Sequence, residues 1–282
     1  MHQSLIPPAL VSVAARKSSA KDKDKDGAAK GSVAAARSGK GGGSSVKKFW
    51  EGFKSIAGTI AIFLILRTFF VEAYRIPSGS MIPALLIGDW LFVNKLRYGP
   101  HIPFTKTNLL GYAEPQRGEV IVLKSPPQFD QPDDLTPTIV KRLVGMPGDT
   151  IYMRDGKLFV DGLAQDPGYR SPEQVKGDGT HYDPLMEWQH KYTVKGTRFG
   201  EPPAQPRLDN WGPLVIPDTM LMMMGDNRYD SKDSRYWGLV PRRNVRGRPM
   251  FVYYSFVPSF QSDRPLSFIT DIRWSRIGHW IK

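Results

Sequence analysis

One apolar segment constrains this chain more than any other feature. Residues Ile56–Tyr74 read IAGTIAIFLILRTFFVEAY, and the part from Ile56 to Val71 contains a single charge, Arg67. A membrane-spanning helix needs about 20 mostly apolar residues, so this run is slightly short by itself. Aromatic residues on both sides lengthen it and suit the two membrane interfaces. We therefore predict one transmembrane helix over residues 54–74.

Two other interpretations of this segment are weaker. A cleaved signal peptide begins nearer the N-terminus and ends in small residues, whereas this segment begins at Ile56 and ends in Phe-Phe-Val-Glu-Ala-Tyr. A buried helix of a soluble protein is the other alternative. Lys47, Lys48 and Lys54 precede the segment, and positive charge is retained on the cytoplasmic side. Residues 75–282 are therefore predicted to lie on the outer side of the membrane.

Residues 1–48 have the composition of a disordered tail. They are rich in Lys, Gly, Ala and Ser, and the run Lys21–Asp26 alternates in sign, so no face can be buried. The chain has a net charge of +12, and much of the excess precedes residue 55. A basic tail can bind nucleic acid, but nothing here resembles a binding fold. We predict a basic cytoplasmic tail with no nucleic-acid partner.

After residue 75 the pattern favours a mainly β fold built of antiparallel sheet, since no long segment has helical periodicity. Asp155-Gly156 separates two short apolar runs and is typical of a type I′ hairpin turn. The predicted strands are 119–124, 138–144, 151–154, 157–160, 219–224 and 249–256. Together they form the expected outer domain.

Residues 162–212 differ from this domain because they are polar and rich in Pro, Gly and Asp. We interpret them as an insertion that forms a smaller lobe or extended loops. His181 and His190 within it are more typical of surface histidines than of a metal pair. The chain has no cysteine, which excludes disulfides and Cys-ligated metals. No metal or cofactor is predicted.

Three further segments carry candidate catalytic residues: Arg75–Pro83 with Ser80, Val140–Asp149 with Lys141, and Gly225–Gly238. A serine hydroxyl needs a base to become a nucleophile, and no histidine occurs in any of these segments. Lysine can serve if burial lowers its pKa from about 10.4, and Ser-Lys pairs are a known catalytic arrangement. Lys141 lies in an apolar run, with Ile139 and Leu143 on the same face of the predicted strand.

Taken singly, each segment is more typical of a turn, an exposed strand edge or a loop. Together and in this order, they resemble the motifs of bacterial type I signal peptidase, from about residue 50 to the C-terminus apart from the insertion. The resemblance implies a serine endopeptidase of the bacterial inner membrane that removes N-terminal signal peptides from exported preproteins. It makes Ser80 the nucleophile and Lys141 the base. It places the oxyanion hole at the Ser80 N–H and the Ser78 hydroxyl.

The resemblance also implies supporting residues. Ser231 would orient the lysine amine, and two ion pairs would support the site: Asp233 with Arg235, and Asp226 with Arg142. The substrate, bound as an added β-strand, would contact Tyr74, Ile76, Leu85, Ile139 and Val140.

The third motif departs from the common family pattern at one point. Tyr229-Asp230 stands where Asp-Asn is usual. A carboxylate close to Lys141 would raise the pKa of the amine and weaken the base. The catalytic hypothesis therefore requires Asp230 to point away from Lys141.

Two alternatives to a general signal peptidase remain open at this level. One is a Ser-Lys peptidase dedicated to a single secreted or pilus substrate, and the other is a non-catalytic, membrane-anchored β module. The expected partners are preproteins and the lipid bilayer. Trp274, Ile277, Trp280 and Ile281 could also touch the membrane, or they could belong to the core.

Overall fold

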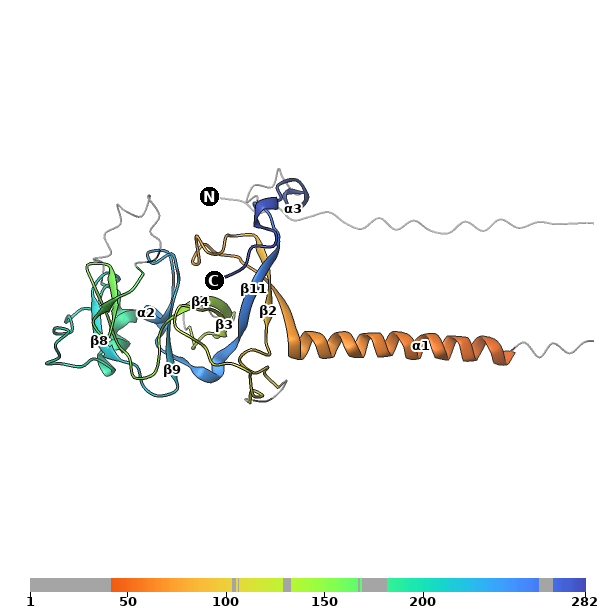
Figure 1. Cartoon of the computed structure of the whole chain (residues 1–282), viewed down its shortest axis with the longest axis horizontal. Coiled ribbons are helices and arrows are strands. Elements are labelled where there is room, and N and C mark those ends of the chain that lie inside the picture. Colours follow the sequence, from red (N-terminus) through yellow and green to blue (C-terminus); the bar gives the residue numbers. More distant parts are fainter. Residues whose placement is uncertain are drawn as a thin grey trace, which may run out of the picture. The chain divides into compact units, whose positions relative to one another are not determined.

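The computed structural model describes residues 42–102, 105, 107–128, 133–166, 168, 182–258 and 266–282 (Figure 1). The predicted disordered tail lies almost entirely outside these residues, as does His181. Gly42–Ile65 form helix α1, which continues as a single π-helical turn, η1 (Leu66–Phe70).

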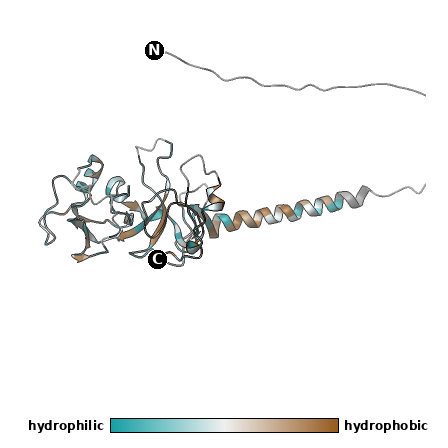
Figure 2. Ribbon diagram, turned by 90° about the horizontal axis from the view of Figure 1, so that it is seen from above, coloured by the Kyte–Doolittle hydropathy of each residue, from teal (hydrophilic) through white to brown (hydrophobic). Residues whose placement is uncertain are grey.

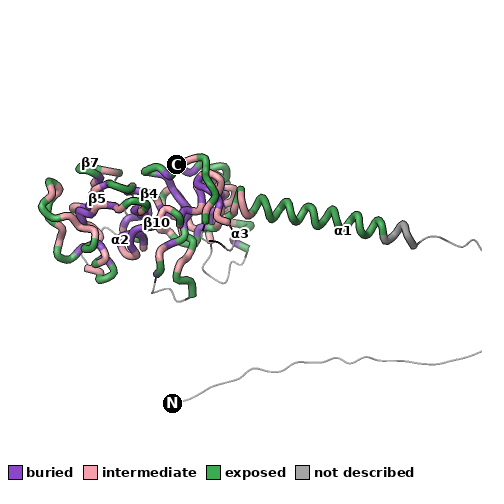
Figure 3. Tube along the Cα trace, turned by 90° about the horizontal axis from the view of Figure 1, so that it is seen from below, coloured by how far each residue is buried: buried purple, intermediate pink, exposed green. Residues whose placement is uncertain are grey.

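The helix carries the predicted membrane segment. Residues Lys47–Phe70 are long and apolar enough to cross a membrane. Phe49 and Phe63 are 74% and 58% exposed, and the tube of α1 has the colour of exposed residues along its described length (Figure 3). Figure 2 shows hydrophobic residues along this helix. A row of exposed apolar side chains is unfavourable in water but suits a lipid environment.

The helix boundaries differ from the predicted 54–74. The described helix begins earlier, at Gly42, and helical structure ends at Phe70, because the next residues form a strand, β1 (Val71–Arg75). Val71 is already extended, with φ −136° and ψ 137°. The Lys95 N–H donates to the Phe70 carbonyl at 3.0 Å and closes the junction. Strand pairing therefore ends a helix that the apolar run alone would extend.

The main sheet has seven antiparallel strands in the order β1-β2-β11-β3-β4-β9-β10, which confirms the predicted mainly β class. Besides β1, its strands are β2 (Asp89–Asn94), β3 (Val120–Lys124), β4 (Thr138–Gly145), β9 (Met220–Met224), β10 (Val240–Pro241) and β11 (Val245–Ser255). In this sheet the sequence pattern predicted neither β1 and β2 nor the short β10. Strand β1 was not predicted because its residues continue the apolar run that was assigned to the helix. In β2, buried Leu91 and Val93 alternate with half-buried neighbours, a signal that was available.

A second sheet has the order β7-β6-β5-β8, with β5 (Thr150–Arg154), β6 (Lys157–Val160), β7 (Leu163–Ala164) and β8 (Trp211–Val215). Asp155 and Gly156 have φ values of 48° and 72°, as the type I′ turn between β5 and β6 requires. The smaller lobe therefore begins near Thr150 rather than at residue 162, because β8 pairs with β5. The 3₁₀ helix η3 (Pro184–Lys191) lies between β7 and β8 in the chain.

The buried apolar residues form three clusters, and the first of them joins the two sheets, since it contains Val144 of β4 and Met222 and Met224 of β9 beside residues of the second sheet. The smaller lobe contributes Trp211, Leu158 and Met186 to this first cluster. One core of the main sheet joins Met81 and Leu85, which follow Ser80, to Leu91, Val122 and the C-terminal Ile281. Ile281 is thus a core residue, while Trp274 and Trp280 are 74% and 65% exposed. The described residues after β9 also form four short helices: α2 (Ser234–Trp237), η4 (Arg242–Asn244), α3 (Ser267–Thr270) and η5 (Trp274–Arg276).

The core makes a direct prediction for stability. Leu123 of β3 is fully buried in the third apolar cluster, which also contains Ile121 and Val245, and Leu163 of β7 is 71% exposed. Leu123→Ala should lower the free energy of unfolding by about 2–5 kcal/mol, since it leaves a cavity, whereas Leu163→Ala should change it by less than about 0.5 kcal/mol. Denaturant unfolding of the full chain in detergent micelles measures both. Equal losses in the two variants would contradict the assigned core.

Candidate active site

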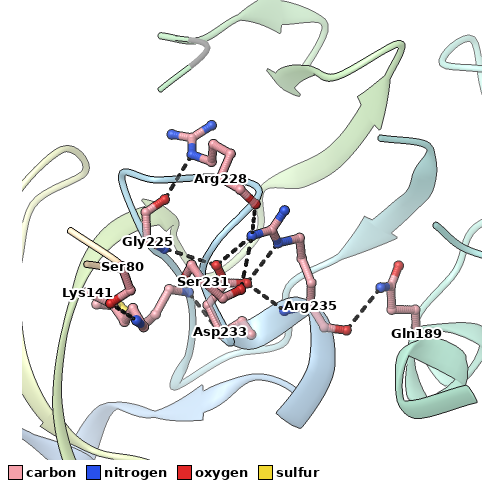
Figure 4. Close-up of polar contacts among 10 residues, drawn as sticks. Ser80, Lys141, Gln189, Gly225, Arg228, Ser231, Asp233 and Arg235 are labelled. Atoms are coloured by element: carbon pink, nitrogen blue, oxygen red, sulfur yellow. Dashed lines mark hydrogen bonds and ion pairs between the residues drawn. The ribbon is translucent and has the colours of Figure 1, made fainter. Parts of the chain in front are cut away.

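Ser80 and Lys141 lie in contact. Lys141 is on β4, only 4% exposed, and its Nζ lies 2.6 Å from Ser80 Oγ (Figure 4). Ser80 is half-buried in the segment that follows β1. Residues 61 positions apart in the chain are therefore held at hydrogen-bond distance. A nucleophile touching a buried base is the geometry that serine activation requires.

The backbone of Ser80 is fixed from two directions. The Asn227 N–H donates to the Ser80 carbonyl at 3.1 Å, and the Asn227 side chain donates to the Gly79 carbonyl at 3.4 Å. On the other side, Met81 and Leu85 are buried in the core. The sequence analysis did not single out Asn227. Its place within the third motif was the signal that could have found it.

The base of this segment is held by a second contact that sequence reasoning missed. Asp89, fully buried, accepts hydrogen bonds from Ser255 at 2.7 Å and from the Leu86 N–H at 2.9 Å. Arg276 pairs with the same carboxylate and also donates to the Ala84 carbonyl at 3.0 Å. Arg276 of the C-terminal segment thus contacts both ends of residues 84–89. A local sequence pattern cannot predict a pair between residues so far apart in the chain.

Burial is the main influence on Lys141. It lowers the pKa of the amine to about 8, because a charged ammonium loses its hydration there. The charge of Asp233 opposes this shift, and the charge of Arg235 reinforces it. Among the described residues, no salt bridge involves Lys141. A substantial fraction of the amine, roughly a tenth at pH 7, is therefore neutral and able to accept a proton.

Asp233 and Arg235 form the predicted ion pair. Arg235 is 1% exposed and Asp233 fully buried, and two contacts of 2.8 Å join the guanidinium to the carboxylate. Asp233 also accepts the Gly225 N–H at 3.0 Å and caps α2 (Figure 4). Because the two charges nearly cancel, the site keeps a rigid polar wall without giving Lys141 a counter-ion.

Arg142 and Asp226 also lie together as predicted. Arg142 Nε and Nη2 donate to the two carboxylate oxygens at 2.6 and 2.7 Å. Nη1 also donates to the Lys282 carbonyl at 3.1 Å. This bidentate pair holds the start of the third motif against β4.

Ser231 does not make the predicted bond to the lysine amine. It is 7% exposed, and its hydroxyl has no hydrogen-bond partner among the described residues. It packs instead against Gly225, where an added Cβ would overlap both Ser231 Oγ and the Ser80 carbonyl. The amine of Lys141 bonds to the Ser80 hydroxyl. Ser231 lies next to these two residues but makes no hydrogen bond to either through its hydroxyl. Its orienting role stays a prediction.

Ser78 lies beside Ser80. Its Oγ is 3.5 Å from Ser80 Oγ, and the side chain is exposed. The hydroxyl is therefore free to turn toward an atom bound in front of Ser80. This position suits a donor to a developing oxyanion.

A small pocket adjoins the dyad. Its volume is about 90 Å³, and it is lined by residues 74–78, Ser80, Met81 and Thr138–Lys141. Four of the predicted substrate contacts therefore line it: Tyr74, Ile76, Ile139 and Val140. Leu85 does not, because it is fully buried in the core behind the segment. Leu85 thus supports the segment rather than the pocket surface.

The structure also describes Tyr229 and Asp230, the two residues at which the third motif differs from the common family pattern. The Tyr229 hydroxyl lies against Gly156 in the hairpin turn of the smaller lobe. Asp230 is exposed and makes no bond to Lys141, though its charge raises the amine's pKa and is the last of the named influences. Within the described part of the chain, no group of three acidic or histidine side chains could hold a metal ion.

Comparison with known proteins identifies the family. The sequence profile described as "Signal peptidase, peptidase S26" matches residues 49–254. The chain belongs to this family. It is therefore a serine endopeptidase, as the motifs predicted, and the non-catalytic β module is set aside.

Individual relatives agree with the family assignment. Signal peptidase I of Pseudomonas aeruginosa is 34% identical over 239 residues, covering 80% of this chain and 77% of that protein. Signal peptidase I of Buchnera aphidicola is 30% identical over 268 residues, covering 80% and 81%. A crystal structure of a signal peptidase I from Enterococcus faecalis V583 gives a TM-score of 0.29 at 25% identity, covering 48% of this chain and 96% of that chain. The fold assignment rests on the strand pairing and does not depend on this weak likeness.

The low pKa of Lys141 predicts a pH-dependent gain in stability when the amine is removed. Between about pH 8 and 10.5 the unfolded chain holds a proton on Lys141 that the folded chain releases. The wild-type fold therefore gains stability as the pH rises through this window and bears the full penalty below it. Lys141→Met should be more stable than wild type at pH 7, by roughly 3 kcal/mol at most.

Denaturant unfolding at pH 7, 8.5 and 10 measures this difference, which should shrink steadily as the pH rises. Lys157→Met removes an exposed lysine of β6 and should show no such trend. A pH-independent difference for Lys141→Met would mean that burial does not perturb the amine.

Proposed function

We propose that this peptidase removes N-terminal signal peptides from exported preproteins, with Ser80 as nucleophile and Lys141 as general base. One observation carries the proposal: the Nζ of a lysine that is 4% exposed lies 2.6 Å from a serine hydroxyl. The family match and the apolar helix support the same activity.

The reaction follows from this contact. Neutral Lys141 accepts the Ser80 hydroxyl proton as Oγ attacks the scissile carbonyl carbon. The resulting oxyanion is held by the Ser80 N–H and the Ser78 hydroxyl, donors of a type each worth ~2.7–4 kcal/mol in the transition state. When the C–N bond breaks, the Lys141 ammonium protonates the leaving amine. Lys141 then takes a proton from water, the hydroxide attacks the ester, and the proton returns to Ser80.

The pocket and the adjacent strand edge support recognition of an extended peptide with small side chains. β4 pairs with β3 through Thr138–Arg142 but with β9 only from Arg142 onward. The backbone of residues 138–141 thus has one side without a strand partner among the described residues, and a peptide can add there. A pocket of about 90 Å³ fits a small side chain and excludes large ones.

A location at the bacterial inner membrane follows from the same proposal. The basic residues before the helix favour a cytoplasmic N-terminus and a catalytic domain on the periplasmic or outer side. The apolar part of a signal peptide lies in the bilayer, so an anchored enzyme meets the cut site at high effective concentration. The partners are then preproteins and the lipid bilayer, with no nucleic acid.

Variants of the dyad test the mechanism. Ser80→Ala and Lys141→Ala should each lower preprotein cleavage by at least about 10³-fold, because either loss disables the same nucleophile. Ser275→Ala and Lys157→Ala alter exposed residues of the same types and should leave cleavage unchanged. The measurement is the rate at which the full chain in lipid vesicles cleaves a preprotein. Undiminished cleavage by either dyad variant would refute the assignment.

A panel of unrelated preproteins separates a general signal peptidase from one dedicated to a single secreted or pilus protein. The small pocket is open to any peptide that carries small side chains at the cut site, so several members of the panel should be cleaved. Cleavage of only one would favour the dedicated peptidase.

The pKa of Lys141 predicts the pH profile. Catalysis needs the neutral amine, so kcat/KM should rise with pH and level off above about pH 8, the pKa of Lys141. A rise centred near 10, as for a solvated lysine, would contradict the burial of the base. Initial rates over pH 6–10.5 at substrate concentrations well below KM give this profile.

A further inference from the structure

Asp230 is an exposed carboxylate beside the nucleophile. An ideal Cβ placed on Gly79, between the two serines of the site, would lie 3.7 Å from Asp230 Oδ2. The backbone N–H of Asp230 donates to the Asn227 carbonyl at 3.1 Å, which fixes the residue in the loop that holds Ser80. Its carboxylate has no hydrogen-bond or ion-pair partner in the described part of the chain. A charge so placed is available to a bound substrate.

The geometry also indicates which part of the substrate it faces. The small pocket for the signal-peptide side is lined by residues 74–78, 80, 81 and 138–141, and by none from the loop 225–231. That loop instead contacts the carbonyls of Gly79 and Ser80 through Asn227. Asp230 therefore lies across the serine turn from the pocket. The substrate chain that continues past Ser80 on this side is the mature part of the preprotein.

We propose that Asp230 is a specificity-determining residue that favours preproteins with a positive charge at the first or second position after the cut and disfavours a negative charge there. The proposal rests on the proposed function. The physical basis is the attraction between an exposed carboxylate and a substrate cation a few ångström away, an interaction that salt weakens. The family motif commonly has Asp-Asn where this chain has Tyr229-Asp230, so the carboxylate stands one position later in this chain, close to Gly79.

The surrounding charges leave this preference intact. The charge of Asp230 acts on Lys141, but this lysine is buried and its amine contacts the Ser80 hydroxyl. Asp226 is engaged by Arg142, and Asp233 by Arg235. Lys232 lies two positions further along the chain and has interactions of its own. Asp230 is thus the carboxylate near Ser80 that no described cation neutralises.

The test compares matched substrates. The full chain in vesicles cleaves one preprotein carrying Lys, Gln or Glu at the second position after the cut, with mass spectrometry confirming the cut site. In wild type, kcat/KM should be highest for Lys and lowest for Glu. In Asp230→Asn the Lys-to-Glu ratio should fall by roughly 3–10-fold, and in Asp230→Lys the order should reverse. Higher salt should reduce the wild-type ratio.

The ratio of kcat/KM for the Lys substrate to that for the Glu substrate separates substrate preference from other effects of Asp230. Removing the carboxylate also lowers the pKa of Lys141, but this changes the rate of all three substrates alike. Asp218→Asn removes another exposed carboxylate and should leave the ratio unchanged. An unaltered ratio in Asp230→Asn and Asp230→Lys, with Ser80-dependent cleavage intact, overturns the proposal for Asp230 alone. Cleavage that persists in Ser80→Ala would overturn the proposed function itself.

Discussion

The site depends on one constraint, a lysine amine kept out of water while it touches a serine hydroxyl. Burial lowers the pKa of Lys141 to about 8, and the strand β4 holds it 2.6 Å from Ser80. A solvated lysine would remain charged near neutral pH and could not accept the proton. The rest of the fold can be understood as the structure needed to keep that amine buried and that contact intact.

The charged groups around the dyad meet this constraint by pairing among themselves. Asp233 with Arg235, and Asp226 with Arg142, give a dense polar support whose charges are already neutralised. An unpaired carboxylate in the same place would raise the pKa of Lys141, so the amine would stay protonated and could not act as a base. The smaller lobe meets this support through the Tyr229 contact with Gly156 and the bond from Trp188 Nε1 to the Arg235 carbonyl at 2.9 Å.

The position of the dyad also suits the substrate. Ser80 follows β1, the edge strand that begins directly after the apolar helix, and the small pocket lies between this segment and β4. Ser80 follows the apolar helix by only a few residues of the chain. If this helix lies in the bilayer, Ser80 acts close to the membrane surface. The carboxylate of Asp230 would then act on the part of the substrate that follows the cut.

The sequence by itself determined the apolar helix, the mainly β class and the hairpin at Asp155-Gly156, and it singled out Ser80 and Lys141, which the fold brings into contact. Each is a local signal: an apolar run, a turn dipeptide, or a motif that contains its own chemistry. It did not determine that helical structure ends at Phe70, that Leu85 belongs to the core, or that the Ser231 hydroxyl has no hydrogen-bond partner among the described residues. It also gave no sign of the Asp89–Arg276 pair. These depend on which strands pair and which distant side chains meet, and tertiary packing alone decides those contacts.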